Sequence, residues 1–367
     1  MKPIYIHCPN LSKFGKHELS VLQLSNQTAE NSLSKFEKDR IDLLLFTSFT
    51  PERYTNEFHL AAKLADSLGL KSVFAIRTET ASSSGASALH VAYSMLAGGQ
   101  FKNALIVGTE IMSKLGREES NLVLGSVLSD RMRNFSMSMA QGAALITKRY
   151  LQDYNYKRED LFYIAKKLHD NGFENPNAHI KKKITEEDYK QAPIFSDPLG
   201  LYDISPLSDG SASLVLSAEV KSDIQIRGIG HGLGEFKSVE LGTSFPSSLA
   251  AYKRAYDMAH LKPSDIQIAE LHDAFTTFEL IGAEDAGLFP KGHALNAVKD
   301  GVSAITGDLP INPSGGLKSR GHPIGASGLA QIVELIRFMR LQNKSTGLAH
   351  SIGGLATNNF ATILERI

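Results

Sequence analysis

The chain has 367 residues, enough for two or more ordinary domain cores, and its 42% hydrophobic and 21% charged residues are typical of a folded globular protein. Lys and Arg together number 39, as do Asp and Glu, so the formal net charge is zero and we expect neither nucleic acid nor a membrane as a partner. The single cysteine, Cys8, excludes an intramolecular disulfide and, with no signal peptide apparent, favours a cytoplasmic protein.

The first part of the chain alternates short apolar runs with helical patterns. Strands are predicted at Ile41–Phe46, Ser72–Ile76 and Ala104–Gly108, and helices at His59–Leu70 and Ser84–Leu96. Strands that are apolar throughout and separated by helices indicate an α/β fold whose sheet is covered on both faces.

The middle of the chain is more charged and has few apolar runs. Amphipathic helices are predicted at Met139–Tyr150 and Arg158–Asn171. Because this stretch interrupts the sheet pattern, we interpret residues 118–196 as an inserted domain.

The alternation of strands and helices resumes after the insertion. Strands are predicted at Ala212–Leu216, Ile224–Ile226, within Asp265–Leu271, and at Leu348–Ile352 and Phe360–Leu364, and helices at Ser247–Ala259, Thr276–Leu288 and Ile324–Leu341. We therefore expect one αβ half made of residues 1–117 with 197–219, and a second made of residues 220–367.

A serine-rich turn, Glu79–Ala88 (ETASSSGASA), lies between a predicted strand and a predicted helix. Its small side chains let a substrate approach the backbone closely. The free N–H groups of the helix N-terminus stabilise a developing negative charge. A serine N-cap without a catalytic role is the alternative interpretation.

A glycine-rich segment, Asn312–Gly328 (NPSGGLKSRGHPIGASG), precedes the longest predicted helix. His322 stands between Gly321 and Pro323, and such a rigid turn holds an imidazole in place, as a general base requires. An incidental histidine in a helix entry is the alternative, and the length of the pattern argues against it.

Two further histidines stand at predicted strand ends. His272 lies in LHDAF, where an imidazole can donate to an oxyanion, although a hydrogen-bonded core histidine is the ordinary alternative. His350 begins HSIGG, which ends in Gly353 and Gly354, and a tight turn is the simpler interpretation of that pair.

Two other patterns are set aside. The segment Gly228–Gly234 (GIGHGLG) suggests a dinucleotide-binding loop, but its third glycine is wrongly spaced and no αβ unit follows directly. The histidines show no metal-ligand spacing, so we expect no metal.

Together these motifs resemble those of the thiolases. Residues 312–328 are similar to the NxxGG…GHPxGASG signature of that family. The HDAF at His272 resembles the HDCF of sterol-carrier-protein-2 type thiolases and their archaeal and bacterial relatives, and the HSIG at His350 resembles the HNxG ending of the same branch. The resemblance extends from Lys13 to the C-terminus.

The resemblance implies a thiolase fold with two αβαβα halves, five-layered, and an inserted loop domain that helps to hold coenzyme A. It implies acyl-CoA as the substrate, no permanently bound cofactor, and a homodimer or dimer of dimers, with a small zinc-ribbon/OB-fold subunit as a further candidate partner. The candidates for holding coenzyme A are Lys181, Lys182, Lys183, Arg131 and Arg133, with the Ser314–Gly315 turn.

The chain departs from the family at its cysteine positions. The nucleophile motif CxSG reads SSSG here, so Ser82 takes the place of the cysteine, and the other motif cysteines fall at Ala274 and Ser351. A serine hydroxyl must be deprotonated by an adjacent base during attack. The resemblance gives that role to His322 and leaves His350 as the remaining second acid or base.

Three functions follow as hypotheses. The first is an acyltransferase of the acetyl-CoA acetyltransferase type, with the acyl group on Ser82, His322 as base, and His272 and the backbone at Gly353 and Gly354 stabilising the oxyanion. The second is a non-catalytic CoA-binding or acyl-binding subunit of a complex. The third is a decarboxylase or hydrolase that uses the oxyanion holes alone.

Overall fold

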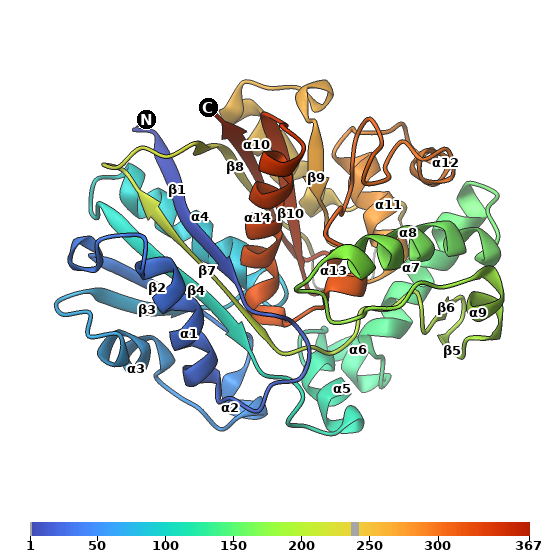
Figure 1. Ribbon diagram of the computed structural model, residues 1–367. Coiled ribbons are helices and arrows are strands. Elements are labelled where there is room, and N and C mark those ends of the chain that lie inside the picture. The colour runs from blue at the N-terminus through green and yellow to red at the C-terminus, as the bar shows by residue number, and fades with distance from the viewer. Residues whose placement is uncertain (1, 236–241) are drawn as a thin grey trace.

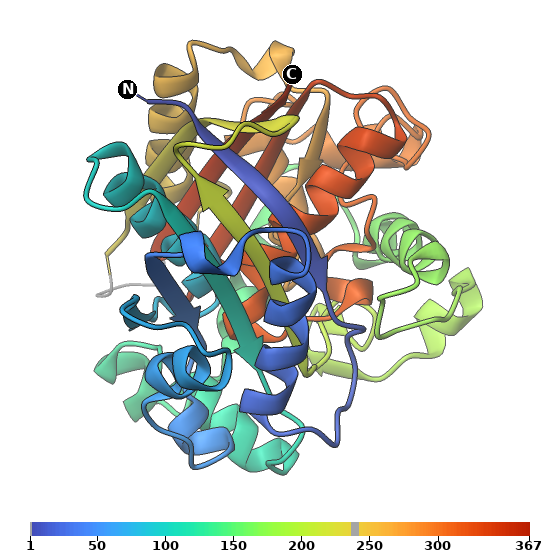
Figure 2. The same cartoon turned by 60° about the vertical axis from the view of Figure 1, so that its left-hand side comes forward.

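A computed structural model describes residues 2–235 and 242–367; Met1 and residues 236–241, which belong to the two predicted halves, lie outside the described residues. Within the described part of the chain, nine strands form one mixed sheet in the order β3-β2-β4-β7-β1-β8-β11-β10-β9 (Figure 2). The strands are β1 (Ile4–Leu11), β2 (Leu43–Thr47), β3 (Phe74–Thr78), β4 (Asn103–Glu110), β7 (Gly210–Ser217), β8 (Ile224–Leu233), β9 (Ile268–Glu270), β10 (Thr346–Gly353) and β11 (Asn358–Arg366). The predicted α/β fold is confirmed.

The helices of the two halves lie on both faces of this sheet. The longer ones are α1 (Val21–Leu33), α3 (Leu60–Ser67), α4 (Ser84–Ala97), α10 (Pro246–Ala259), α11 (Thr276–Asp285) and α14 (Ile324–Leu341). Short helices are α2 (Pro51–Tyr54), α12 (Ala294–Lys299) and α13 (Gly316–Arg320), with 3₁₀ turns η1 (Lys38–Arg40) and η3 (Pro263–Asp265) in the connections.

The N-terminal half is built around β2, all of whose residues are buried. It pairs in parallel with β3 and β4, and β7 pairs antiparallel to both β4 and β1. Alternate residues point to opposite faces: Leu44 and Phe46 pack with α1 and α3, whereas Leu43 and Leu45 pack with α4. Two covered faces explain why the first four residues of this strand are apolar.

The C-terminal half is built on an antiparallel group, β8, β11 and β10, with β9 parallel to β10. Helix α10 lies directly on β8. A side chain at Gly228, Gly230 or Gly232 would overlap the backbone of that helix at positions 255, 251 and 247. The glycine repeat that suggests a dinucleotide loop is therefore a strand whose missing side chains let a helix approach closely.

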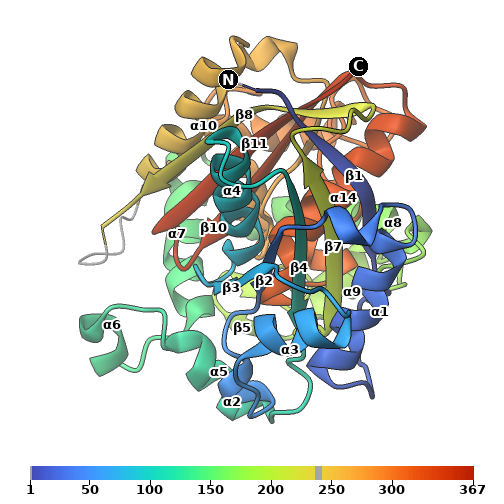
Figure 3. The same cartoon turned by 90° about the vertical axis from the view of Figure 1, so that its left-hand side faces the viewer.

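The two halves meet along one strand pair and one pair of helices. Strand β1 pairs with β8, with Ile4 opposite Ile226, which joins the two parts of the sheet. Helices α4 and α14 pack against each other, α14 contacting strands of both halves, and share one core cluster (Figure 3). The two parts of the sheet therefore lie on either side of α4 and α14, and outer helices cover their other faces, so the described residues form layers in the order helix, sheet, helix, sheet, helix.

The segment between β4 and β7 is mainly helical and lies beside the C-terminal half (Figure 1). It contains α5 (Arg117–Gly125), α6 (Asp130–Asn134), α7 (Met139–Asp153), η2 (Arg158–Asp160), α8 (Leu161–Glu174), α9 (Glu186–Gln191) and the hairpin β5 (Ile194–Ser196) and β6 (Leu199–Gly200). A buried ion pair between Lys167 of α8 and Glu279 of α11 ties it to that half. The domain limits 118–196 stay a prediction.

None of the helices in residues 2–235 and 242–367 is both long and apolar enough to cross a membrane.

Candidate active site

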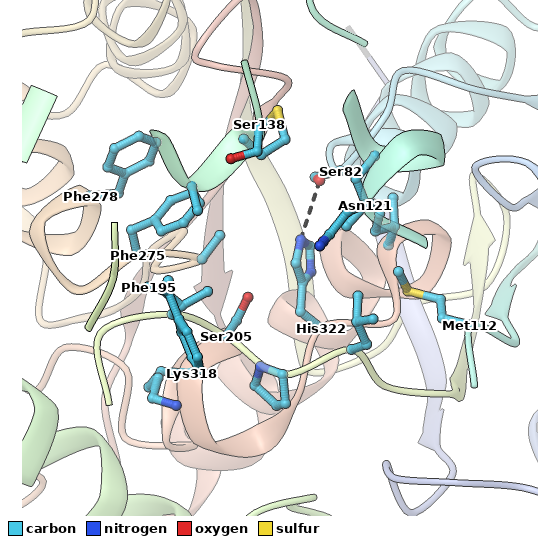
Figure 4. Close-up of a pocket in the computed structure, with 18 of the residues that line it drawn as sticks. Ser82, Met112, Asn121, Ser138, Phe195, Ser205, Phe275, Phe278, Lys318 and His322 are labelled. Atoms are coloured by element: carbon cyan, nitrogen blue, oxygen red, sulfur yellow. Dashed lines mark hydrogen bonds between the residues drawn. The ribbon is translucent and has the colours of Figure 1, made fainter. Parts of the chain in front are cut away.

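A cavity of about 580 Å³ opens between the inserted segment and the central helices (Figure 4). Its wall is formed by residues that are far apart in the sequence: Ser82, Met112, Arg117, Asn121, Leu124, Ser138, Met139, Ala140, Ile180, Phe195, Leu201, Ile204, Ser205, Pro206, Leu207, His272, Ala274, Phe275, Phe278, Lys318, His322, Ile324 and Gly354. Three of the predicted catalytic residues, Ser82, His272 and His322, therefore share one cavity.

Ser82 and His322 lie within hydrogen-bond distance in this cavity. Ser82 Oγ is 3.2 Å from His322 Nε2 (Figure 4). On the other side of the ring, His322 Nδ1 is 2.6 Å from Ser327 Oγ, and that hydroxyl donates to the carbonyl of Pro323 at 2.8 Å. Because the Ser327 proton is used there, Ser327 accepts from His322 Nδ1–H, and the lone pair of Nε2 is left to accept the proton of Ser82.

The imidazole of His322 is uncharged at neutral pH. Burial lowers its pKa to about 3, and the nearby positive charge of Arg320 acts in the same direction. An uncharged ring can accept a proton from Ser82, so both tautomer and charge suit a general base.

Two glycines fix the distance between serine and histidine. Ser82 precedes α4 and His322 precedes α14, and these helices cross where Gly85 faces Gly328. A Cβ on Gly85 would lie 2.6 Å from the backbone nitrogen of Leu329, and one on Gly328 would overlap the backbone of α4. Only glycine at both positions lets the two helix starts come this close.

The start of α14 is also anchored to the N-terminal half. Glu110, at the end of β4, accepts from the backbone of Gly325 at 2.8 Å and from the hydroxyl of Ser48 at 2.8 Å. Burial raises the pKa of Glu110 to about 7. A side chain on Gly325 would overlap the backbone at Ser48, so this glycine too allows close packing.

His272 forms the cavity wall next to His322. The rings of His272 and His322 are 5.3 Å apart and nearly perpendicular, and burial holds the pKa of His272 well below its usual range. Among the described residues, the buried Nδ1 of His272 has no hydrogen-bond partner. A neutral imidazole with an unused N–H can donate to an oxygen that gains negative charge.

The neighbouring Asp273 supports this wall from behind. It accepts from the backbone N–H of Leu317 at 2.6 Å and of Lys318 at 3.2 Å, which holds the start of α13. A side chain on Gly316 would overlap its carboxyl group, so the glycine pair of the long motif makes room for Asp273.

His350 lies outside the cavity wall. It is 1% exposed, its Nε2 is 3.0 Å from Ser248 Oγ, and its ring packs against Tyr252. The next residue, Ser351, donates to Gln331 at 2.5 Å. The structure thus places His350 behind the cavity, bonded to α10.

The glycine pair after His350 lies beside the serine-rich turn that carries Ser82. Gly354 lines the cavity. Gly353 packs on the turn itself, where a Cβ would lie 2.6 Å from Ser83 Oγ and from the carbonyl oxygen of Thr80.

The basic residues suggested for coenzyme A do not line the cavity. Lys181, Lys182 and Lys183 are exposed and bonded to the Phe173 carbonyl, Asp188 and Glu174, respectively, and Arg131 and Arg133 are exposed on α6. Ser314 donates to Glu270 at 2.8 Å, and Gly315 packs on Gly172 of α8. Ser314 and Gly315 therefore hold the motif in place instead of facing the cavity.

Other residues of the cavity were not found from the sequence. Arg117 and Asn121 lie one turn apart on α5, and the guanidinium group of Arg117 packs over the ring of Phe195. Lys318 lies inside the motif of residues 312–328, and the motif alone assigns it no role. Isolated polar residues on helices carry no sequence signal that separates a cavity wall from a solvent-exposed face.

Family models match most of the chain. The model "Thiolase, N-terminal domain" matches residues 10–220, and "Thiolase C-terminal domain-like" matches residues 240–366.

Individual relatives agree with these matches. An acetyl-CoA acetyltransferase of Methanothermobacter thermautotrophicus is 29% identical over 89% of this chain and 89% of its own length. Rat sterol carrier protein 2 is 31% identical over 78% of this chain and 58% of its own length. The solved structure of an Ltp2-ChsH2(DUF35) aldolase has a TM-score of 0.83 at 23% identity, covering 100% of this chain and 98% of its own.

Proposed function

Because the chain belongs to the thiolase family, we propose that it transfers acyl groups from acyl-CoA thioesters through Ser82, in the manner of an acetyl-CoA acetyltransferase. The observation that carries the proposal is the hydrogen bond between Ser82 Oγ and His322 Nε2, with Ser327 holding the ring in the required tautomer. Acyl-CoA is the substrate, and the reaction needs no permanently bound cofactor.

Each step uses a group that lines the cavity. Ser82 Oγ attacks the thioester carbonyl carbon while its proton passes to His322 Nε2, and the carbonyl oxygen accepts the negative charge. An N–H of His272 donates to that oxygen. The C–S bond then breaks, coenzyme A leaves as a thiol with the proton from His322, and an ester remains on Ser82.

A serine makes this reaction depend on its base more strongly than a cysteine would. A thiol has a pKa near 8.5 in water and ionises partly without help, whereas a hydroxyl does not. The low pKa of His322 makes it a weak base. We therefore expect acylation of Ser82 that is slow and almost entirely lost without His322.

Intact-mass spectrometry tests the proposal. After incubation with acetyl-CoA, wild-type protein should gain the mass of one acetyl group, and peptide mapping should place it on Ser82. The variants Ser82→Ala and His322→Gln should not gain it. An unmodified wild-type protein that binds acetyl-CoA would contradict acyl transfer, and release of CO₂ from malonyl-CoA without an adduct would favour a decarboxylase.

A second candidate is a CoA-binding subunit of a complex. Its support is the structural likeness to the Ltp2-ChsH2(DUF35) aldolase, together with Leu122 of α5 and Phe135 directly after α6, which are 75% and 77% exposed. A small zinc-ribbon/OB-fold subunit is the partner that we propose for this surface. Co-expression with such a subunit should yield a complex that Leu122→Asp with Phe135→Asp dissociates.

We also propose that the chain forms a homodimer or dimer of dimers through the edge of its N-terminal half. Strand β3 ends the sheet on that side, and Phe74 on it is 46% exposed. An unpaired edge strand offers backbone groups to a second copy. Analytical ultracentrifugation should show a dimer for the wild type and a monomer for Phe74→Asp.

A further inference from the structure

Lys318 is a buried cation on the wall of the cavity. It lies on α13, is 2% exposed, and is one of the lining residues. Figure 4 draws it on the same side as Phe195 and Phe275, whereas Ser82 and His322 are drawn on the other side. It therefore belongs to a part of the wall that is otherwise mostly apolar.

The ammonium group of Lys318 has no ion pair or hydrogen bond among the described residues. Other buried cations of the structure do have anionic partners: Lys167 pairs with Glu279, and Arg320 lies 3.4 Å from Glu270. Because Lys318 lines the cavity, an anionic group of a ligand that enters the cavity can pair with this ammonium, and the pairing strengthens as water is excluded.

Two carboxyl groups, Asp203 and Asp273, act on Lys318 electrostatically, and both also accept hydrogen bonds from other groups. Asp273 accepts from the backbone N–H groups of Leu317 and Lys318, and burial raises its pKa to about 7. Asp203 accepts from Tyr189 at 2.8 Å and from Thr276 at 3.1 Å. Burial lowers the pKa of Lys318 to about 8, so the group still carries its positive charge at neutral pH.

We propose that Lys318 determines substrate specificity by pairing with a carboxylate at the far end of the acyl group, so that the preferred substrates are CoA thioesters of dicarboxylic acids. The inference rests on the proposed function and names the substrate class for the same cavity. A single buried ammonium matches a single carboxylate, whereas the strongly hydrated phosphates of coenzyme A suit an exposed cation such as Arg117. The aromatic side chains Phe195, Phe275 and Phe278 would contact the methylene groups between thioester and carboxylate.

Calorimetric titration of the Ser82→Ala protein measures binding without acyl transfer. The ligands are pairs with equal numbers of acyl carbons: succinyl-CoA with butyryl-CoA, glutaryl-CoA with valeryl-CoA, and adipyl-CoA with hexanoyl-CoA. For at least one pair, the carboxylated member should bind about tenfold or more tightly, as expected for a charge-assisted hydrogen bond. Lys318→Met, which keeps the length of the side chain, should abolish that preference.

The matched control is Lys253→Met, which removes a lysine that is 75% exposed on α10 and should leave the preference unchanged. If the Ser82→Ala protein with Lys318 unchanged binds both members of every pair equally well, the inference is overturned, and acyl-CoA binding itself stays supported. A preference that survives Lys318→Met would also overturn it. Failure to bind any of the six thioesters would instead reject the proposed function, and the inference with it. If Lys318→Met does not fold, Lys318→Gln takes its place, and it too should abolish the preference.

Discussion

Replacing Ser327 with alanine tests how the base is positioned. Ser327 is the acceptor for His322 Nδ1–H, and both groups are buried. Alanine removes the acceptor and leaves that N–H unpaired, which costs about 1–3 kcal/mol in a buried site. The cost is greatest when the ring becomes an imidazolium, because Arg320 nearby already disfavours a second positive charge. Since ~1.4 kcal/mol is tenfold in rate, acylation of Ser82 should slow by roughly tenfold to a hundredfold.

The assay is the single-turnover rate of acetyl adduct formation on Ser82, followed by intact mass at saturating acetyl-CoA. Ser87→Ala is the matched control, because Ser87 donates to the carbonyl of Ser84 at 2.8 Å on the neighbouring helix and does not contact His322. It should leave the acylation rate unchanged. A Ser327→Ala protein with normal stability and a wild-type rate would refute the argument that this hydroxyl sets the tautomer of the base.

The remaining predictions concern the nucleophile, the base, the helix crossing and a buried carboxyl group. Ser82→Cys should accelerate acetyl adduct formation, because a thiol ionises more readily in the same position; a variant with no adduct after hours at neutral pH would contradict this. The wild-type acylation rate should stay flat from pH 7 to pH 5, because the pKa of His322 is lowered to about 3 and the base form is lost only near that pH; a fall with a midpoint near 6.5 would indicate an ordinary histidine. Gly328→Ala should lower the free energy of unfolding by at least 1–3 kcal/mol through overpacking, an order-of-magnitude estimate, whereas Gly125→Ala, whose Cβ meets nothing closer than 3.9 Å, should be neutral or stabilising in denaturant titrations. The folded-state pKa of Glu110 is raised from 4.5 to about 7, so its stabilising contribution is fully present below pH 4.5 and is lost as pH rises through 7. Across this range the free energy of unfolding should fall by up to about 3 kcal/mol, measured as a lower melting temperature. The fall should be smaller in Glu110→Gln.

The accuracy of the sequence predictions depended on whether the pattern was local. The predicted bounds of the helix Ile324–Leu341 are those of α14, since a continuous apolar pattern follows Pro323. Strand β8 was predicted only at Ile224–Ile226 but continues to Leu233, because the glycines there have no strand preference and are explained only by the helix that packs on them. Helix α1 was missed because its sequence is rich in Ser, Asn, Gln and Thr.

The residues of the candidate site also differ in whether the sequence identifies them. Ser82, His272 and His322 stand in motifs long enough to be recognised, and all three line the cavity. His350 stands in a motif too, but on its strand the side chain points toward Ser248. The sequence of a short strand does not show which of its two faces points toward the cavity. Lys318 was not singled out because a lysine on a helix is usually solvated, and only tertiary burial separates it from that case.

The place of β1 in the sheet constrains when the protein can fold during synthesis. This first strand is hydrogen-bonded on one side to β7 and on the other to β8, whose residues are made some two hundred positions later. Until then the N-terminal half exposes an unpaired strand and the apolar surface that α14 finally covers. Long-range pairing of this kind slows folding and leaves intermediates prone to aggregate. A ribosome-bound chain that ends just before residue 210 should therefore depend on chaperones, even though it already contains Ser82, the whole of α4 and the inserted segment.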